Sequence, residues 1–135
     1  MKYQLEITEN QAQIIENALD FYSRIQMGQF DELISNFSSP LYKDLLKNNP
    51  DYDKLKFYIN ELKKEILPEL SINSFYSIGN KSRPDSSRIS FDLIQVIRYR
   101  LSWDKYPEGG IGVNFDKPMK FSTTESLAKI KKIEE

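Results

Sequence analysis

Two kinds of apolar spacing occur along the chain, and the helical kind dominates. Between Thr8 and Gly28, apolar residues recur three and four positions apart, which predicts an amphipathic helix with one broad face on a core. Thr8 and Gln11 have the spacing of a capping box, and Gly28 stands where a left-handed cap ends a helix. Further helices are predicted at about residues 51–66 and 86–104, with shorter helical pieces at 30–36 and 41–46.

Strand-like alternation marks two other segments. Residues 2–7 (KYQLEI) and residues 111–115 (IGVNF) place apolar side chains at every second position. We expect these two strands to pair and so to close both parts of the chain against the same helices. The sequence therefore predicts a single α+β domain over residues 1–135, mostly helical with a small antiparallel sheet.

A tail helix is predicted over about residues 123–135. Ser122 and Glu125 have the spacing of a second capping box, and Leu127, Ile130 and Ile133 would lie on one side of the helix that follows. Such a side suits a contact with a second copy of the chain, and equally a fold-back onto its own domain.

The composition excludes many kinds of catalytic and metal-binding site. The chain has no cysteine and no histidine, which excludes disulfides, thiolate metal sites, and triads or general bases built on histidine. No apolar run approaches the roughly 18 to 20 residues of a membrane span. We therefore expect a cytoplasmic protein without catalytic residues, cofactor or bound metal.

The charge is nearly balanced but unevenly distributed. The net charge is -1, yet four of the five arginines lie after residue 80. General nucleic-acid binding is not expected, because that affinity comes from many neutralised phosphates. A local site for a small anion stays open.

One dense run, FDLIQVIRYRLSWDKYPEGGIGVNFDKP at residues 91–118, contains most candidate site residues. Arg100 and Asp104 have i, i+4 spacing and predict an ion pair on a helix, whereas Arg98 and Arg100 point to different faces. One interpretation is a surface ion pair beside a core tryptophan. The other is a site in which an arginine holds a phosphate or carboxylate while Trp103 or Tyr106 stacks on a planar group.

The remaining candidates surround this run or lie on the first helix. Gly109 and Gly110 suit a tight turn, and would also allow a ligand to approach backbone N–H groups. Arg24 is the first arginine of the chain and falls near the end of its helix, where an anion-binding role is open. The carboxylates nearest the glycine turn, which could hold a hard cation, match no established metal loop; they are Asp104, Glu108 and Asp116.

Two segments resemble a family of small uncharacterised proteins found in bacteriophage and prophage genomes. They are ALDFYSRIQMGQFDELI at residues 18–34 and VIRYRLSWDKYPEGGIGVNFDKPMKFS at residues 96–122, with residues 35–85 unmatched. The resemblance carries no catalytic residues. It implies an accessory protein that acts on host machinery, a recurring theme being the sequestration of a nucleotide immune signal.

These observations lead to alternative hypotheses of function. The first is a non-enzymatic phage accessory protein that sequesters a small anionic, nucleotide-type ligand to counter host defence, through the candidate residues Arg24, Arg98, Arg100, Trp103, Tyr106, Gly109 and Gly110. The second is an inhibitor or adaptor that binds a host protein. The third, a metal-dependent hydrolase, would need the carboxylate cluster.

Overall fold

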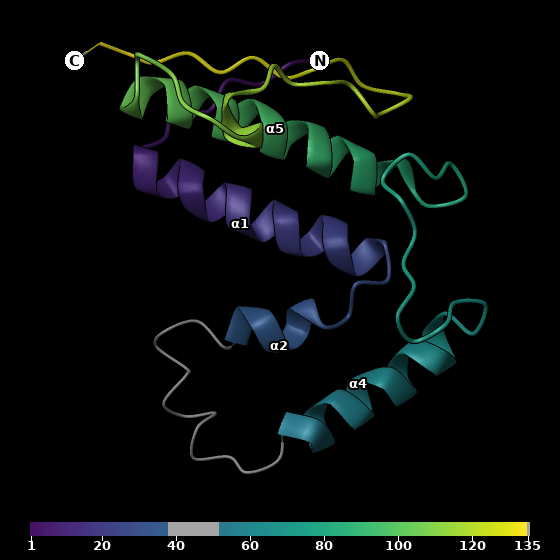
Figure 1. Ribbon diagram of the computed structural model, residues 1–135. Coiled ribbons are helices and arrows are strands. Elements are labelled where there is room, and N and C mark those ends of the chain that lie inside the picture. Colours follow the sequence, from purple (N-terminus) through teal and green to yellow (C-terminus); the bar gives the residue numbers. More distant parts are fainter. Residues whose placement is uncertain (38–51, 135) are drawn as a thin grey trace.

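The computed structural model describes residues 1–37 and 52–134, and this part of the chain is helical (Figure 1). Its elements are α1 (Glu9–Gln26), α2 (Glu32–Phe37), α4 (Tyr52–Ile66), α5 (Asp85–Lys105) and the 3-10 turn η1 (Val113–Phe115). The helices predicted at these places are confirmed. The helical piece predicted at residues 41–46 lies outside the described residues.

The prediction of an α+β fold with an antiparallel sheet is wrong. None of the residues in 1–37 and 52–134 forms a strand. Gly112 takes a φ of +117°, and the N–H groups of Phe115 and Asp116 then donate locally to Gly112 and Val113. Local turn bonds therefore replace the cross-strand bonds that alternation at residues 111–115 had predicted.

The tail beyond Thr124 is also not helical, although half of its predicted cap forms. Ser122 Oγ accepts from the N–H of Glu125 at 3.0 Å, as a capping box requires. The reciprocal bond is missing, because the N–H of Ser122 donates to Asp92 instead. Residues 125–134 follow as a non-helical segment in place of the predicted helix.

The central pair of helices is α1 and α5, which run antiparallel and side by side (Figure 1). At one end of the pair, the Tyr22 hydroxyl lies 3.2 Å from Ser86 Oγ, and Ser23 Oγ donates to the carbonyl of Ser87 at 3.1 Å. Polar side chains therefore join the two helices at this end. Apolar residues of α5, such as Ile94, are buried farther along the helix.

Both ends of α1 form the caps that the sequence predicts. Thr8 and Gln11 exchange side-chain and backbone bonds in a complete capping box. At the other end Gly28 takes a φ of +87°, its N–H donates to Ile25, and the N–H of Gln29 donates to Arg24, both at 3.0 Å. This pair of bonds is a Schellman motif, which needs the left-handed conformation that glycine adopts without strain.

The face of α5 opposite α1 holds residues 119–124, which we call the strap. Gln95 exchanges two hydrogen bonds with the backbone of Met119, at 2.8 and 3.0 Å. The carboxylate of Asp92 accepts from the N–H groups of Phe121 (2.8 Å) and Ser122 (3.0 Å). Polar side chains of the helix thus take the place that a neighbouring strand would have in a sheet.

Asp85, in the first turn of α5, completes the attachment of the strap. Its carboxylate accepts from the N–H groups of Thr123 and Thr124, at 3.0 and 3.2 Å, and from the hydroxyls of Ser122 and Thr124. Arg88 donates to the same carboxylate at 2.8 Å. Helix α5 is therefore covered by α1 on its apolar face and by the strap on its polar face.

Replacing Asp92 by asparagine should loosen the strap. The amide keeps the shape but can accept with one oxygen only, so one buried N–H of the strap loses its partner. We expect the free energy of unfolding, measured by urea denaturation, to fall by about 1–3 kcal/mol. Asp116→Asn, at an exposed loop position, is the matched control and should leave stability unchanged; equal stability of both variants would contradict this role.

Acid should weaken the strap through Asp85. Hydrogen bonds from Thr124 and Thr123 hold the pKa of this carboxyl well below its usual range. Because its pKa is lower in the folded protein, the stabilisation is complete above the unfolded value of about 3.9 and is lost as the pH falls below it. We expect Asp85→Asn to lose less stability than the wild type between about pH 5 and pH 2.

Urea denaturation at a series of pH values measures this dependence. Asp116→Asn removes an exposed carboxylate and should retain the wild-type fall with acid. An Asp85→Asn variant whose stability falls as steeply as that of the wild type would show that the strap does not depend on the charge of Asp85.

Candidate functional site

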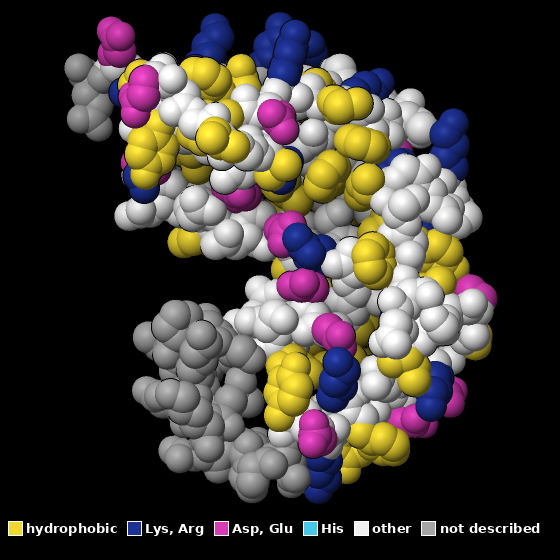
Figure 2. All heavy atoms as spheres, viewed as in Figure 1, with side chains coloured by type: hydrophobic (Ala, Val, Ile, Leu, Met, Phe, Trp, Pro, Cys, Tyr) yellow, Lys and Arg dark blue, Asp and Glu magenta, His cyan; other side chains and the backbone are white. Residues whose placement is uncertain are grey.

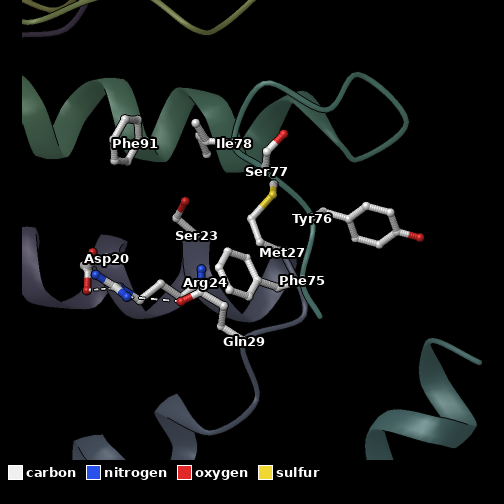
Figure 3. A pocket seen from close by; sticks show the side chains of 10 residues that line it. All are labelled: Asp20, Ser23, Arg24, Met27, Gln29, Phe75, Tyr76, Ser77, Ile78 and Phe91. Carbon is white, nitrogen blue, oxygen red and sulfur yellow. Dashed lines mark hydrogen bonds and ion pairs between the residues drawn. The ribbon is translucent and has the colours of Figure 1, made fainter. Parts of the chain in front are cut away.

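A small hollow lies where residues 75–78 pass the end of α1 (Figure 3). Its volume is about 150 Å³. It is lined by Asp20, Ser23, Arg24, Met27, Gln29, Phe75, Tyr76, Ser77, Ile78 and Phe91. Figure 3 shows Arg24 across one wall, while the ring of Tyr76 points away from the hollow.

Arg24, a predicted ligand-binding residue, is engaged by acidic and amide side chains. Its Nε lies 2.8 Å from Asp20 Oδ2, and its Nη1 lies 3.1 Å from Gln29 Oε1 and 3.4 Å from Glu32 Oε1. The pair with Asp20 has the i, i+4 spacing of a helix surface. An anion at this guanidinium would therefore compete with two carboxylates.

Two other arginines fix loops through backbone carbonyls. Arg83 donates from Nε to the carbonyl of Gln26 at 2.9 Å, and its guanidinium stacks 5.1 Å from the ring centroid of Tyr76. The buried Arg88 donates to the carbonyls of Asn80 (2.7 Å) and Arg83 (3.2 Å). These bonds attach residues 80–84 to the end of α1 and the start of α5.

Lys63 has the same kind of role on α4. It is buried, and its Nζ donates to the carbonyls of Ile72 (3.0 Å) and Ser74. A second hollow of about 260 Å³ lies beside it, between α4 and residues 28–32. Helix α4 is thus connected to the following loop by a buried cation rather than by a broad helix-helix contact.

The two predicted arginines of α5 lie on different sides of the helix, as the sequence predicts. Arg98 lies over the ring of Phe91, 5.8 Å from its centroid. It also faces Glu16 of α1, where burial raises the pKa of the glutamic acid and the arginine charge opposes that rise. Arg100 pairs with Asp104, which raises the pKa of the guanidinium and confirms the predicted i, i+4 ion pair.

Aromatic rings gather at the end of α5. The ring centroids of Trp103 and Phe115 are 5.6 Å apart in an edge-to-face contact, and Tyr99 lies 6.2 Å from the tryptophan. Tyr106 lies 6.4 Å from Phe115. Because η1 supplies Phe115, this cluster closes the turn that follows α5.

The two glycines of that turn make room for these rings. Gly109 has a φ of +85°, and a Cβ added there would lie 3.1 Å from the Trp103 ring. A Cβ on Gly110 would lie 2.5 Å from the ring of Phe115. Gly109 is required by its positive φ and Gly110 by an aromatic neighbour of the same chain, both independently of any ligand.

Apart from Arg98, which lies over Phe91 farther back along α5, the predicted site residues occupy two separate regions. Arg100, Trp103, Tyr106, Gly109 and Gly110 lie at the end of α5. Arg24 lies near the start of α5, because Ser23 bonds to Ser87. Ser87 and Trp103 are sixteen positions apart on the helix, which corresponds to about 24 Å along the axis. The seven residues therefore do not share one pocket, and the described residues contain no carboxylate cluster suited to a metal.

A surface that the sequence analysis did not single out lies on α4. Tyr58, Leu62 and Ile66 lie one helical turn apart, and 57%, 46% and 56% of their surfaces are exposed. Hydrophobic side chains reach the surface over this region in Figure 2. We call these residues, together with Leu55 and Ile59, the α4 face. Their spacing was visible in the sequence, but nothing in the sequence indicated that the other described elements leave this face exposed.

Comparisons with known proteins give no further guide to this surface. No protein-family model, curated protein or solved structure matches the chain. None of the helices in the described ranges is both long and apolar enough to cross a membrane.

A methyl group at Gly110 should disrupt the aromatic cluster. In Gly110→Ala the ring of Phe115 has to move away, and its contact with Trp103 is lost. We expect stability to fall by about 1–3 kcal/mol and the fluorescence of the single tryptophan to change. Gly79→Ala is the control, since a Cβ there meets nothing within 4 Å. An unchanged Gly110→Ala emission spectrum would contradict the packing described.

Proposed function

We propose that the protein acts by binding another protein through the α4 face. The observation that carries the proposal is the exposure of Tyr58, Leu62 and Ile66 on a helix that has no broad contact with another described helix. Large apolar side chains at regular helical spacing are costly to leave in water, and contiguous exposed patches of this kind commonly mark interaction sites.

The partner that fits best is a folded protein with an apolar groove. Leu55, Tyr58, Ile59 and Leu62 stand at positions i, i+3, i+4 and i+7, the spacing by which a helix inserts its anchors into a groove. The helix is already formed in the free chain, and Lys63 in its last turn attaches it to the loop that follows. Binding would then not include the entropic cost of forming the helix.

The alternative of a small anionic ligand has less support. Hollows of about 150 and 260 Å³ are smaller than the roughly 300–1,000 Å³ typical of small-molecule sites. Arg24 and Arg100 already pair with carboxylates, and Arg98 stacks on a ring. Sequestration of a nucleotide signal stays a prediction, and the resemblance to phage proteins makes a bacterial host protein the natural partner of the α4 face.

Loss of two anchors should abolish partner binding without unfolding the protein. We expect the wild-type chain, used as bait in a bacterial lysate, to retain a protein in stoichiometric amount. Leu62→Ser with Ile66→Ser should lose it, because serine removes apolar area that contacts the groove. Quantitative mass spectrometry of the eluates measures the retention, and circular dichroism checks the helix content.

Ile14→Ser is the matched control. Ile14 is an apolar residue that is 66% exposed, like those of the α4 face, but it lies on α1. This variant should retain the partner. Equal retention by all three chains would refute the α4 face as the binding surface, and release of a small molecule with no retained protein would favour the ligand hypothesis.

A further inference from the structure

The N-terminal segment, residues 2–7, has a strand-like sequence and no partner in the described part of the chain. Its backbone N–H and C=O groups form no hydrogen bond with any residue in 1–37 or 52–134. Tyr3 and Leu5, on its apolar side, are 89% and 72% exposed. In Figure 1 the segment is a non-helical trace that runs from the start of α1 back past α5 to the N-terminus.

The segment joins α1 at a fixed point. The capping box of Thr8 and Gln11 determines where α1 begins and in which direction the chain enters it. A short segment that combines alternating apolar residues with unpaired backbone groups is a ready template for pairing with another strand.

The charges of the segment indicate which strand fits. In an antiparallel pair centred on Gln4, the numbers of any two facing residues add up to eight. Lys2 of one copy then faces Glu6 of the other, and Glu6 faces Lys2. Tyr3 faces Leu5 on the opposite side of the ribbon. Opposite charges and aromatic-aliphatic pairs are the cross-strand neighbours that stabilise such a ribbon.

Neighbouring registers lack this complementarity. Centring the pair on Leu5 places Lys2 opposite Thr8 and Gln4 opposite Glu6, so neither charge finds its opposite. In registers where the numbers of two facing residues add up to an odd number, polar residues face apolar ones, because side chains alternate between the two faces of a strand. Only the register centred on Gln4 places each charge opposite one of the other sign and keeps polar residues on one face and apolar residues on the other.

We propose that residues 2–6 of two copies of the chain pair antiparallel about a two-fold axis at Gln4. The contact is isologous, since the same segment supplies both strands. An isolated two-stranded ribbon is only marginally stable in water, so the dimer is weak and depends on concentration. This contact is independent of the α4 face, and it replaces the tail helix that the sequence suggested for a dimer.

Charge reversal tests the register. In Lys2→Glu, glutamates oppose each other at both pairs, and in Glu6→Lys, lysines do. Sedimentation equilibrium of the tag-free full chain should show a dimer for the wild type, with a dissociation constant at least about tenfold higher for each variant. An equimolar mixture of the two variants should restore dimerisation, because every pair is then opposite in charge.

A second mixture controls for general charge attraction. Lys117→Glu and Glu108→Lys change the net charge by the same amounts at exposed loop positions. Each should dimerise like the wild type, and mixing them should bring no gain. Circular dichroism checks folding, which these substitutions at exposed positions should leave intact.

Three outcomes would overturn the proposal. They are a wild type that stays monomeric at every concentration, a dimer insensitive to either charge reversal, and a mixture of Lys2→Glu and Glu6→Lys that associates no better than its components. A dimer lost instead in the Leu62→Ser/Ile66→Ser chain would place the contact on the α4 face.

Discussion

The arrangement depends on the hydrogen bonds by which α5 holds the strap. Asp85, Asp92 and Gln95 project from the face of the helix that α1 does not cover, and they satisfy the strap backbone as a neighbouring strand would. Buried backbone groups need such partners, and charged acceptors make the strongest bonds. The chain that follows α5 is thereby returned along it, and η1 is placed where Phe115 contacts Trp103.

Several positively charged side chains of the protein also bind backbone groups. Arg83, Arg88 and Lys63 bind backbone carbonyls, and in doing so they hold the loops on either side of residue 76. Arginines clustered in a sequence suggest an anion site, yet here their donors are used within the fold. Both proposals concern proteins as partners, because α4 and the N-terminal segment expose apolar side chains at regular spacing.

Much of the helical structure could be predicted, because its signals are local. The capping box at Thr8, the glycine cap at Gly28 and the ion pair of Arg100 and Asp104 each depend on residues within a few positions of one another. The sheet was predicted from alternation, which reports a half-exposed segment but does not reveal its pairing partner. The polar stripe of α5 could be understood only once the strap, some thirty residues later, was seen to lie on it.

Amide hydrogen exchange of the dilute protein tests this account most directly. If polar side chains of α5 hold the strap, the N–H groups of Met119, Phe121 and Ser122 are protected in the wild type. Asp92→Asn then speeds exchange at Phe121 and Ser122 more than at Met119, which Gln95 holds, while residues 2–7 exchange freely in both chains. Protection of alternate amides in residues 2–7 and 111–115 of the monomer, unaffected by Asp92→Asn, would instead reveal an intramolecular sheet and contradict the account.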